Sequence, residues 1–455
     1  MSAAKRKRST PGADSAAPVA TSDVLCRWLR AGGGAVDGRL AFEAAEGVTA
    51  TADIPKGTVL LRVPAVLCLG PAAGQQLAPG LAFASVAAAL ACELSAGLDS
   101  SYAAYTTSLP ALPNSLLAWT DAEFALLAGT SLADAARGSA RESLTAAVRA
   151  ALPPSAPAFS DDALLRAAAI LLTRGFNPGS AGPALVPALD LVRHDSDPAG
   201  IGAAVSVATD GAFVLTAVRD LPCGQEVYHS YSSHLSQAGL LRVHGRVAVA
   251  PARADAAAAV APLRVSEVVA FARAAAETRG HAAEMSRDGA ASVDAVFDTR
   301  CARLRAIGML PGPDNDLLLV PAPALSSATE FALPRLPREI LSPVIALLLP
   351  DEAFDDWAAP EATEGDEVAT LSLDEDLLVA GGGDMAILAL CAFETAMKAI
   401  DASKARLQLE PAAADVASLQ MGRVAAANAV RTEELGALRQ VQALFSMSLR
   451  RFKTE

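Results

Sequence analysis

Two tyrosines, Tyr228 and Tyr231, lie near the end of the segment GQEVYHSYSS at residues 224–233. The chain has only 4 Tyr among its 455 residues, and aromatic residues make up 4% of it. A β-branched and aromatic run that follows a turn-forming glycine indicates a β-strand. A preference for strand formation explains the extended conformation of this segment but not the choice of tyrosine. Each tyrosine could therefore be a packing residue, or its hydroxyl could have a function.

Histidines gather in the same part of the chain, which raises the hypothesis of a metal-dependent enzyme. Four of the five histidines, with two aspartates, lie between residues 194 and 244: His194, His229, His234, His244, Asp195 and Asp197. No pair of them has the i, i+4 helical spacing or the compact spacing of known metal sites. We therefore predict no metal site. A serine or cysteine hydrolase is not indicated either, because the chain has no GxSxG motif.

The charge balance limits the class of partner. Acidic residues outnumber basic ones, 50 to 37, for a net charge of −13. This disfavours binding to nucleic acid, which requires neutralisation of phosphates, and favours a protein partner with a basic surface or tail. The 6 cysteines are scattered without a CxxC pair, which indicates a reducing compartment and neither disulfides nor a zinc cluster.

The hydrophobic content of 52% is inflated by alanine. The longest uncharged stretch, Val63 to Cys92, is interrupted by prolines and glycines, so no apolar run of the roughly 18 residues of a spanning helix is expected. We therefore expect a soluble protein that binds no membrane.

Residues 1–22 are rich in Ala, Ser and Pro, which predicts a disordered tail, and they lack the apolar region of a secretion signal. Their KRKR run could be a nuclear address or a solvated basic run, and its flank could belong to an organelle transit peptide. The sequence therefore leaves three locations for the protein open: the cytoplasm, the nucleus and a plastid.

Periodicity and turn signals predict a mixed layout. A short helix at 23–31 ends at the glycines of AGGG. Strands are expected at 39–44, 47–54 and 58–64, and again at 184–192, 203–210, 211–218 and 225–232. Residues 80–175 are expected to be mostly helical, and the ATDG turn at 208–211 predicts a hairpin. The chain is thus a β unit that is interrupted by a helical insert and then resumes.

After about residue 255 the sequence predicts helices almost throughout. The last helix carries an apolar stripe at intervals of three or four residues, made of Leu435, Leu438, Val441, Phe445, Leu449 and Phe452. An acidic stretch at 351–378 contains no Lys or Arg and reads as a solvated loop or as a surface that attracts a basic substrate. For a chain of this length, two or three domains are expected.

Several motifs together resemble a known family. GVTATADIPKGTVLLRVP at 47–64 resembles the opening of a SET domain. TRGF at 173–176, LVPALDLVRHD at 185–195 and GQEVYHSYSSHLSQAGLLRVHG at 224–245 resemble its closing half in the Rubisco large-subunit lysine methyltransferases and their relatives. Residues 100–130 resemble the helical insert of that subfamily, and residues 423–445 resemble the end of its C-terminal domain.

The resemblance implies an α+β fold, with a β-rich SET core that is interrupted by a helical insert and followed by an all-α domain. The implied boundaries are a tail at 1–22, a SET domain at 23–250 with its insert at about 75–170, and a helical substrate-binding domain at 255–455. It also implies an enzyme that transfers methyl groups from S-adenosylmethionine to lysine side chains of a protein substrate. We expect this enzyme to be a monomer.

By position in these motifs, the resemblance assigns roles to individual residues. Tyr231 matches the catalytic tyrosine. Gly47, Arg174 and His194 match residues that contact the cofactor. Phe176 and Asp190 match residues of the channel that admits the methyl acceptor.

The chain also departs from the family pattern. Arg193 stands where the family usually has an asparagine that touches the amino-acid end of the cofactor, so its guanidinium could pair with the carboxylate there or repel the ammonium. His229 and His244 replace channel residues that are usually apolar and tyrosine, respectively, and Ala45 replaces a frequent glycine. These departures leave open a histidine N-methyltransferase of the same fold, and a SET-type module that binds protein without catalysis.

Overall fold

The computed structural model describes residues 20–43, 47–70, 82–111, 113–133, 137–177, 182–195, 197–231, 235–247, 261–278, 292–306, 308, 310–312, 316–319, 338–349, 354, 382–408 and 421–454. Ala45, His234, the KRKR tail and the acidic stretch apart from Phe354 lie outside them. Contacts divide the chain into a first unit, Met1–Pro113 with Ala140–Tyr231, and a second unit, Asn114–Ser139 with Ser232–Glu455. The predicted domain boundaries stay a prediction.

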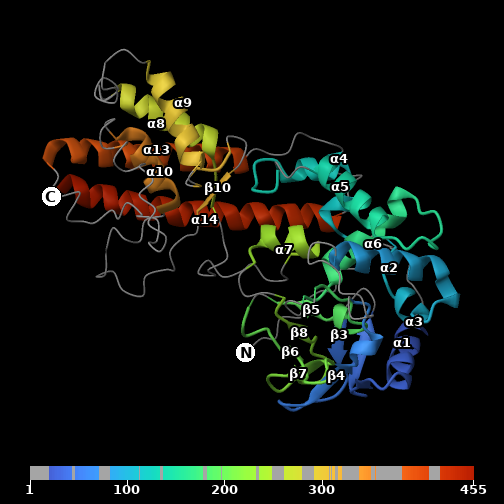
Figure 1. The fold of residues 1–455 in the computed structure, drawn as a ribbon. Helices are drawn as coiled ribbons and strands as arrows, with labels where there is room; N and C mark the ends of the chain where they lie inside the picture. The colour runs from blue at the N-terminus through green and yellow to red at the C-terminus, as the bar shows by residue number, and fades with distance from the viewer. Residues whose placement is uncertain are drawn as a thin grey trace, which may run out of the picture. The chain divides into compact units, whose positions relative to one another are not determined.

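The first unit combines short strands with a few helices (Figure 1). Its elements are α1 (Ala20–Ala31), β1 (Ala35–Val36), β2 (Leu40–Glu43), β3 (Gly47–Ala50), β4 (Val59–Val63), η1 (Ala65–Leu67), α2 (Ala82–Ala96), η2 (Gly97–Asp99), α3 (Ala103–Thr106), most of α5 (Arg137–Ala150), α6 (Asp161–Arg174), η5 (Leu189–Leu191), β5 (Arg193–His194), β6 (Ala203–Val207), β7 (Phe213–Ala217) and β8 (Tyr228–His229).

Segments far apart in the sequence share one antiparallel sheet with the strand order β1-β4-β7-β6. Strand β7 alternates buried and partly exposed residues, and its buried side chains Phe213, Leu215 and Ala217 join the hydrophobic core. The turn between β6 and β7 contains Gly211 at φ +79°, a conformation that glycine adopts without strain. The expected hairpin and the sheet built from distant segments are both confirmed.

Helices α2 and α6 pack against each other on this core (Figure 1). The helical segment Ala82–Asp99 is long and apolar enough to cross a membrane, with a mean hydropathy of 1.4. No such run was expected, because this segment contains Glu93 and Asp99 and so extends beyond the uncharged stretch Val63–Cys92. Buried residues such as Val86 and Leu90 belong to the core, which is also how a core helix of a soluble protein behaves.

Two expected strands differ in the structure. Residues 184–192 form isolated bridges at Ala184 and Leu185, then a turn, and then η5, because Ala188 adopts φ +66°, which no strand residue does. The expected strand at 225–232 is reduced to the two residues of β8. Helix α1 begins three residues earlier than predicted, at Ala20.

The second unit consists mainly of long helices (Figure 1). Its elements are η3 (Leu116–Ala118), α4 (Asp121–Phe124), η4 (Ala125–Leu127), α7 (Gln237–His244), β9 (Ala261–Arg264), α8 (Val265–Thr278), α9 (Val293–Ala306), β10 (Asp316–Leu319), α10 (Arg338–Leu348), α13 (Gly382–Gln408) and α14 (Met421–Thr454).

Helix α14 contributes to two hydrophobic clusters of this unit. Leu438, Val441 and Phe445, from the predicted apolar stripe, are fully buried with residues of α8, α9, α10 and α13. Val430 and its neighbours pack with residues of η3, η4 and α7. The unit is not purely helical as expected, because β9 and β10 pair as a two-stranded antiparallel sheet.

Candidate active site

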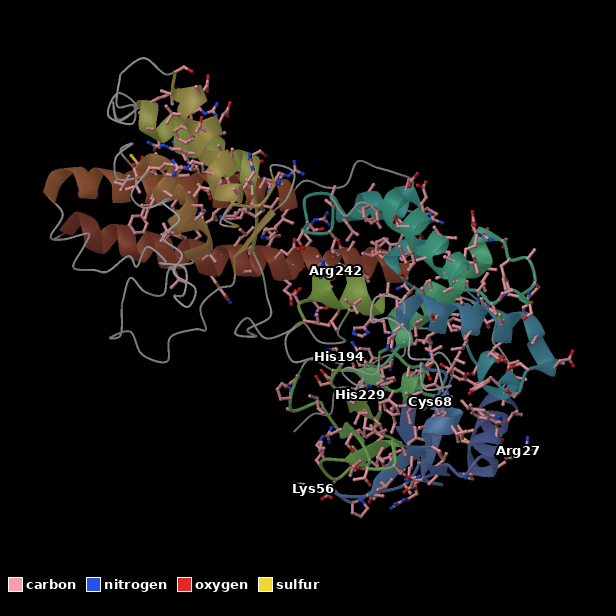
Figure 2. All side chains as sticks on the ribbon, in the orientation of Figure 1. Arg27, Lys56, Cys68, His194, His229 and Arg242 are labelled. Carbon is pink, nitrogen blue, oxygen red and sulfur yellow. The ribbon has the colours of Figure 1, made fainter. Side chains whose placement is uncertain are left out.

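A short parallel ladder brings two of the sequence motifs together. Strand β5 pairs with β8 so that Arg193 lies beside Tyr228 and His194 beside His229. The histidines are 6% and 3% exposed and lie close together in the first unit (Figure 2). The ladder therefore brings residues more than thirty positions apart in sequence into one site.

Hydrogen bonds hold both the backbone and the side-chain hydroxyl of Tyr231. Its backbone N–H donates to Nδ1 of His194 at 2.9 Å, and its hydroxyl donates to the carbonyl oxygen of Val192 at 3.0 Å. The two rings stack at a centroid distance of 5.1 Å. A phenol that is held by two contacts to the β5 segment has a defined position, which a residue at a reaction centre requires.

His194 is neutral in this arrangement. Because Nδ1 accepts the N–H of Tyr231, the ring proton belongs on Nε2. Burial lowers the pKa of His194 below its usual 6.5, although a hydrogen bond with the backbone of His229 and the charge of Asp195 act in the opposite direction. The acceptor of the Tyr231 N–H is therefore preserved at neutral pH.

An aromatic wall lies next to Tyr231. The His229 ring lies 4.8 Å from the Tyr231 ring and stacks on Phe176 at 6.0 Å, and Phe176 meets Phe213 edge-on, also at 6.0 Å. Such a surface suits an alkyl chain or the face of an organic cation. Phe176 and His229, which were both predicted to line the channel, thus contact each other, and His229 also contacts Tyr231.

The end of α6 positions Phe176. The helix starts at the side-chain cap of Ser160 and ends at Gly175, where a Cβ would lie 2.5 Å from the carbonyl oxygen of Leu171. Only a glycine fits this close approach without a shift. The chain then leaves the helix, and Phe176 forms a backbone bridge with Ala184.

Arg174, the last residue of α6, belongs to a buried triad with Asp190 and Tyr105. Its Nη1 donates to Oδ2 of Asp190 at 3.0 Å, and the Tyr105 hydroxyl donates to the same oxygen at 3.1 Å. The side chains of Arg174 and Asp190 are 9% and 1% exposed. Burial alone would lower the pKa of Arg174, but the Asp190 carboxylate raises it, so the guanidinium stays charged.

The turn before Asp190 is strained. Ala188 has φ +66° and ψ −30°, a region that non-glycine residues rarely adopt, and it is fully buried. Strain of this kind persists only where the surroundings fix the backbone. Here the turn places Asp190 against Arg174.

A second triad of the same composition, Arg193, Glu226 and Tyr228, is partly open to solvent. Arg193 pairs with Glu226 through Nε and Nη2, and the Tyr228 hydroxyl donates to Oε2 of Glu226 at 2.6 Å. The side chains of Arg193 and Glu226 are 33% and 19% exposed. Tyr228, the other tyrosine of the 224–233 segment, therefore makes a polar contact of its own.

Gly47 lies against this second triad. It has φ +93°, and a Cβ there would lie 2.5 Å from Oε1 of Glu226 and 3.0 Å from Nε of Arg193. Gly47 was predicted to contact the cofactor, where a missing side chain would let the backbone approach a ligand. In the structure it also leaves room for the ion pair.

The structure brings most of the predicted site residues into the first unit, where ring contacts join Phe176 to His229, His229 to Tyr231 and Tyr231 to His194. His244 ends α7 in the second unit, and its predicted role in the channel stays a prediction, as do the predicted cofactor contact of Arg174 and channel position of Asp190. Sequence reasoning missed Glu226 and Tyr105. Within the part of the chain that the structure describes, no group of three or more His, Cys, Asp or Glu side chains could hold a metal ion.

No protein-family model matches this chain, and no curated protein sequence does. Solved structures do match. The SET domain of LSMT bound to lysine and AdoHcy aligns over 96% of this chain and 93% of its own length, with a TM-score of 0.60 and 18% identity. Rubisco LSMT bound to AdoMet aligns over 96% and 94%, with a TM-score of 0.59 and 18% identity.

These matches show that the chain has the fold of the SET domain of Rubisco LSMT over nearly its whole length. The predicted α+β fold class is therefore confirmed.

Proposed function

We propose that this chain is an S-adenosylmethionine-dependent protein N-methyltransferase that acts on a lysine side chain. The observation that carries the proposal is Tyr231, held between His194 and Val192 in a chain with the SET fold. Structures with this fold have been solved with AdoMet, with AdoHcy and lysine, and with sinefungin and monomethyllysine.

The residues around the ladder fit such a cofactor. Gly47 gives a stretch of backbone without a side chain, and the adjacent Arg193–Glu226 pair offers one positive and one negative group. His194 lies on the same strand as Arg193 and would contact the adenosine part through its backbone. The cofactor supplies a methyl group that is already activated on a sulfonium, so this reaction requires no metal.

The remaining work belongs to the protein, which must orient an amine and exclude water. The Tyr231 hydroxyl donates its hydrogen bond to the carbonyl oxygen of Val192, so the phenol oxygen can accept a hydrogen bond from the amine and stabilise positive charge near the methyl group. Phe176 and His229 form an aromatic wall along which the alkyl chain can lie. A free lysine has a pKa near 10.4, and a desolvated site of this kind favours the neutral, nucleophilic form.

The charge of the chain supports a basic protein substrate. With a net charge of −13, it attracts lysine-rich surfaces or tails at long range. A cytoplasmic, nuclear or plastid location is compatible with this proposal.

A histidine acceptor is the second candidate, and the contact of His229 with Tyr231 favours it because an imidazole makes the acceptor channel more polar. The third is a non-catalytic module that keeps the fold and binds a protein partner, which the replacement of the usual asparagine by Arg193 favours. The three candidates differ in the product they form and in whether they bind the cofactor.

The test is transfer of a labelled methyl group from S-adenosylmethionine to proteins of a cell extract, followed by mass spectrometry of the product. The proposal predicts label on lysine. Label on histidine would replace it with the second candidate. No labelled protein, together with no calorimetric binding of S-adenosylmethionine at millimolar concentration, would favour the binding module.

A further inference from the structure

The Arg193–Glu226 pair is held in place and still accessible. Arg193 uses Nε and Nη2 for Glu226, and Nη1 makes no hydrogen bond to any residue that the structure describes. Its guanidinium carbon lies 5.8 Å from the centre of the Tyr228 ring. Contacts on two sides fix the plane of the guanidinium, and one nitrogen remains available for a ligand.

The charges of the triad are defined at neutral pH. The hydrogen bonds with Glu226 raise the pKa of Arg193, so it stays positive. Burial, and then the hydrogen bond with Glu226, raise the pKa of Tyr228 to about 12, so its hydroxyl stays a donor. The triad therefore presents one cation and one anion side by side, with no net charge.

The position of the pair links it to the site. Arg193 directly precedes His194, which binds Tyr231, and both charged groups lie beside the backbone of Gly47, in the space that its missing side chain leaves. The other pair of the first unit that lies near Tyr231, Arg174 with Asp190, is enclosed and bound by Tyr105. Of the two, only Arg193–Glu226 can meet a charged ligand without opening the core.

S-Adenosylmethionine carries an α-amino acid, which also presents one anion and one cation on adjacent atoms. We propose that Arg193 binds the carboxylate of this amino acid through Nη1, that Glu226 binds its ammonium group, and that Tyr228 positions Glu226. This inference rests on the proposed function, because it concerns the same cofactor site. A guanidinium at position 193 could attract the carboxylate of the cofactor or repel its ammonium group. Glu226 offsets the repulsion, so the attraction to the carboxylate prevails.

Calorimetry with ligands that differ only at the amino acid tests this assignment. The probes are S-adenosylhomocysteine, its decarboxylated and desamino analogues, and 5′-methylthioadenosine, which lacks the amino acid. Wild-type protein should bind S-adenosylhomocysteine most tightly. Arg193→Met should weaken that binding roughly 10- to 100-fold, as expected for a lost hydrogen bond between charged groups, and abolish the preference over the decarboxylated analogue. Glu226→Gln should abolish the preference over the desamino analogue.

Arg62→Met is the matched control, because Arg62 on β4 is about as exposed as Arg193 and also pairs with a carboxylate, that of Asp210. This variant should leave all four affinities unchanged. Unchanged affinity for 5′-methylthioadenosine in the site variants would show that they are folded and that the effect is specific to the amino acid. If Arg193→Met bound S-adenosylhomocysteine with the same affinity as the wild-type protein, the assignment would be overturned and the proposed function would stay intact. Loss of all four ligands in Arg193→Met would also overturn it, since Arg193 would then be structural. Failure of the wild-type protein to bind any of them would overturn the proposed function itself.

Discussion

The first unit contains two triads of the same composition, an arginine, a carboxylate and a tyrosine, with opposite exposure. Arg174, Asp190 and Tyr105 are enclosed, and the Asp190 side chain is 1% exposed. Arg193, Glu226 and Tyr228 lie at the edge of the short β5–β8 ladder, and the Arg193 side chain is 33% exposed. The residue types therefore do not decide what each triad does.

The exposure of each triad decides its role, because a buried charge has lost its hydration and an exposed charge has not. A buried ion pair adds little net stability, but removal of one partner leaves a charge in the core without its counter-ion. A partly exposed pair tolerates the same change, because water solvates the remaining charge. The enclosed triad thus fixes the strained turn that leads to β5, whereas the open triad can exchange partners with a ligand.

The largest expected effect is on the enclosed triad. Asp190→Asn should lower the free energy of unfolding by about 3 to 5 kcal/mol, because Arg174 stays buried without a negative partner. Urea denaturation measures this change. Asp210→Asn is the control, since it breaks an exposed pair with Arg62 and should leave stability unchanged. An equally small loss in both variants would show that burial does not separate these pairs.

Glu226→Gln should affect stability much less. Arg193 stays partly hydrated, so the loss should be below about 1 kcal/mol in the same denaturation experiment. The variant should nevertheless change ligand selectivity, as described above. A loss as large as that of Asp190→Asn would mean that the open triad is also structural.

The smallest expected effect is the dependence of stability on pH that comes from His194. Its pKa is lowered below 6.5 in the folded protein, so the unfolded chain binds the proton more readily. The stability that His194 contributes should therefore be complete above pH 6.5 and should be lost as the pH falls through the lower, folded-state pKa. NMR titration of the imidazole measures this value, and a pKa at or above 6.5 would contradict the assigned role of Nδ1 as acceptor.

The sequence allowed much of the site to be predicted where short motifs carry it. The resemblance of the segments around His194 and Tyr231 to motifs of one family predicted that these residues belong to one site, and the ladder brings them into contact. The hairpin of β6 and β7 followed from its turn. Local patterns of this kind depend on residues that are close in the sequence.

The missed features depend on pairing between distant segments. Tyr105 and Asp190 are 85 residues apart, and nothing in either segment indicates their contact. Glu226 and Tyr228 are two residues apart and so lie on the same side of an extended segment, which was an available signal for a shared polar role. Their partner Arg193 becomes evident only from the register of β5 and β8. The strand predicted at 184–192 was wrong because tertiary packing imposes positive φ on Ala188.

The most direct test of the account compares Tyr231→Phe with Tyr102→Phe. Both substitutions remove a hydroxyl that donates to a backbone carbonyl, of Val192 and Val66 respectively, but only Tyr231 contacts His194. Tyr231→Phe should reduce methyl transfer by about 100-fold or more while leaving the affinity for S-adenosylmethionine within twofold, since the hydroxyl acts on the reacting groups. Tyr102→Phe should keep full activity. Wild-type turnover in Tyr231→Phe would contradict the mechanism.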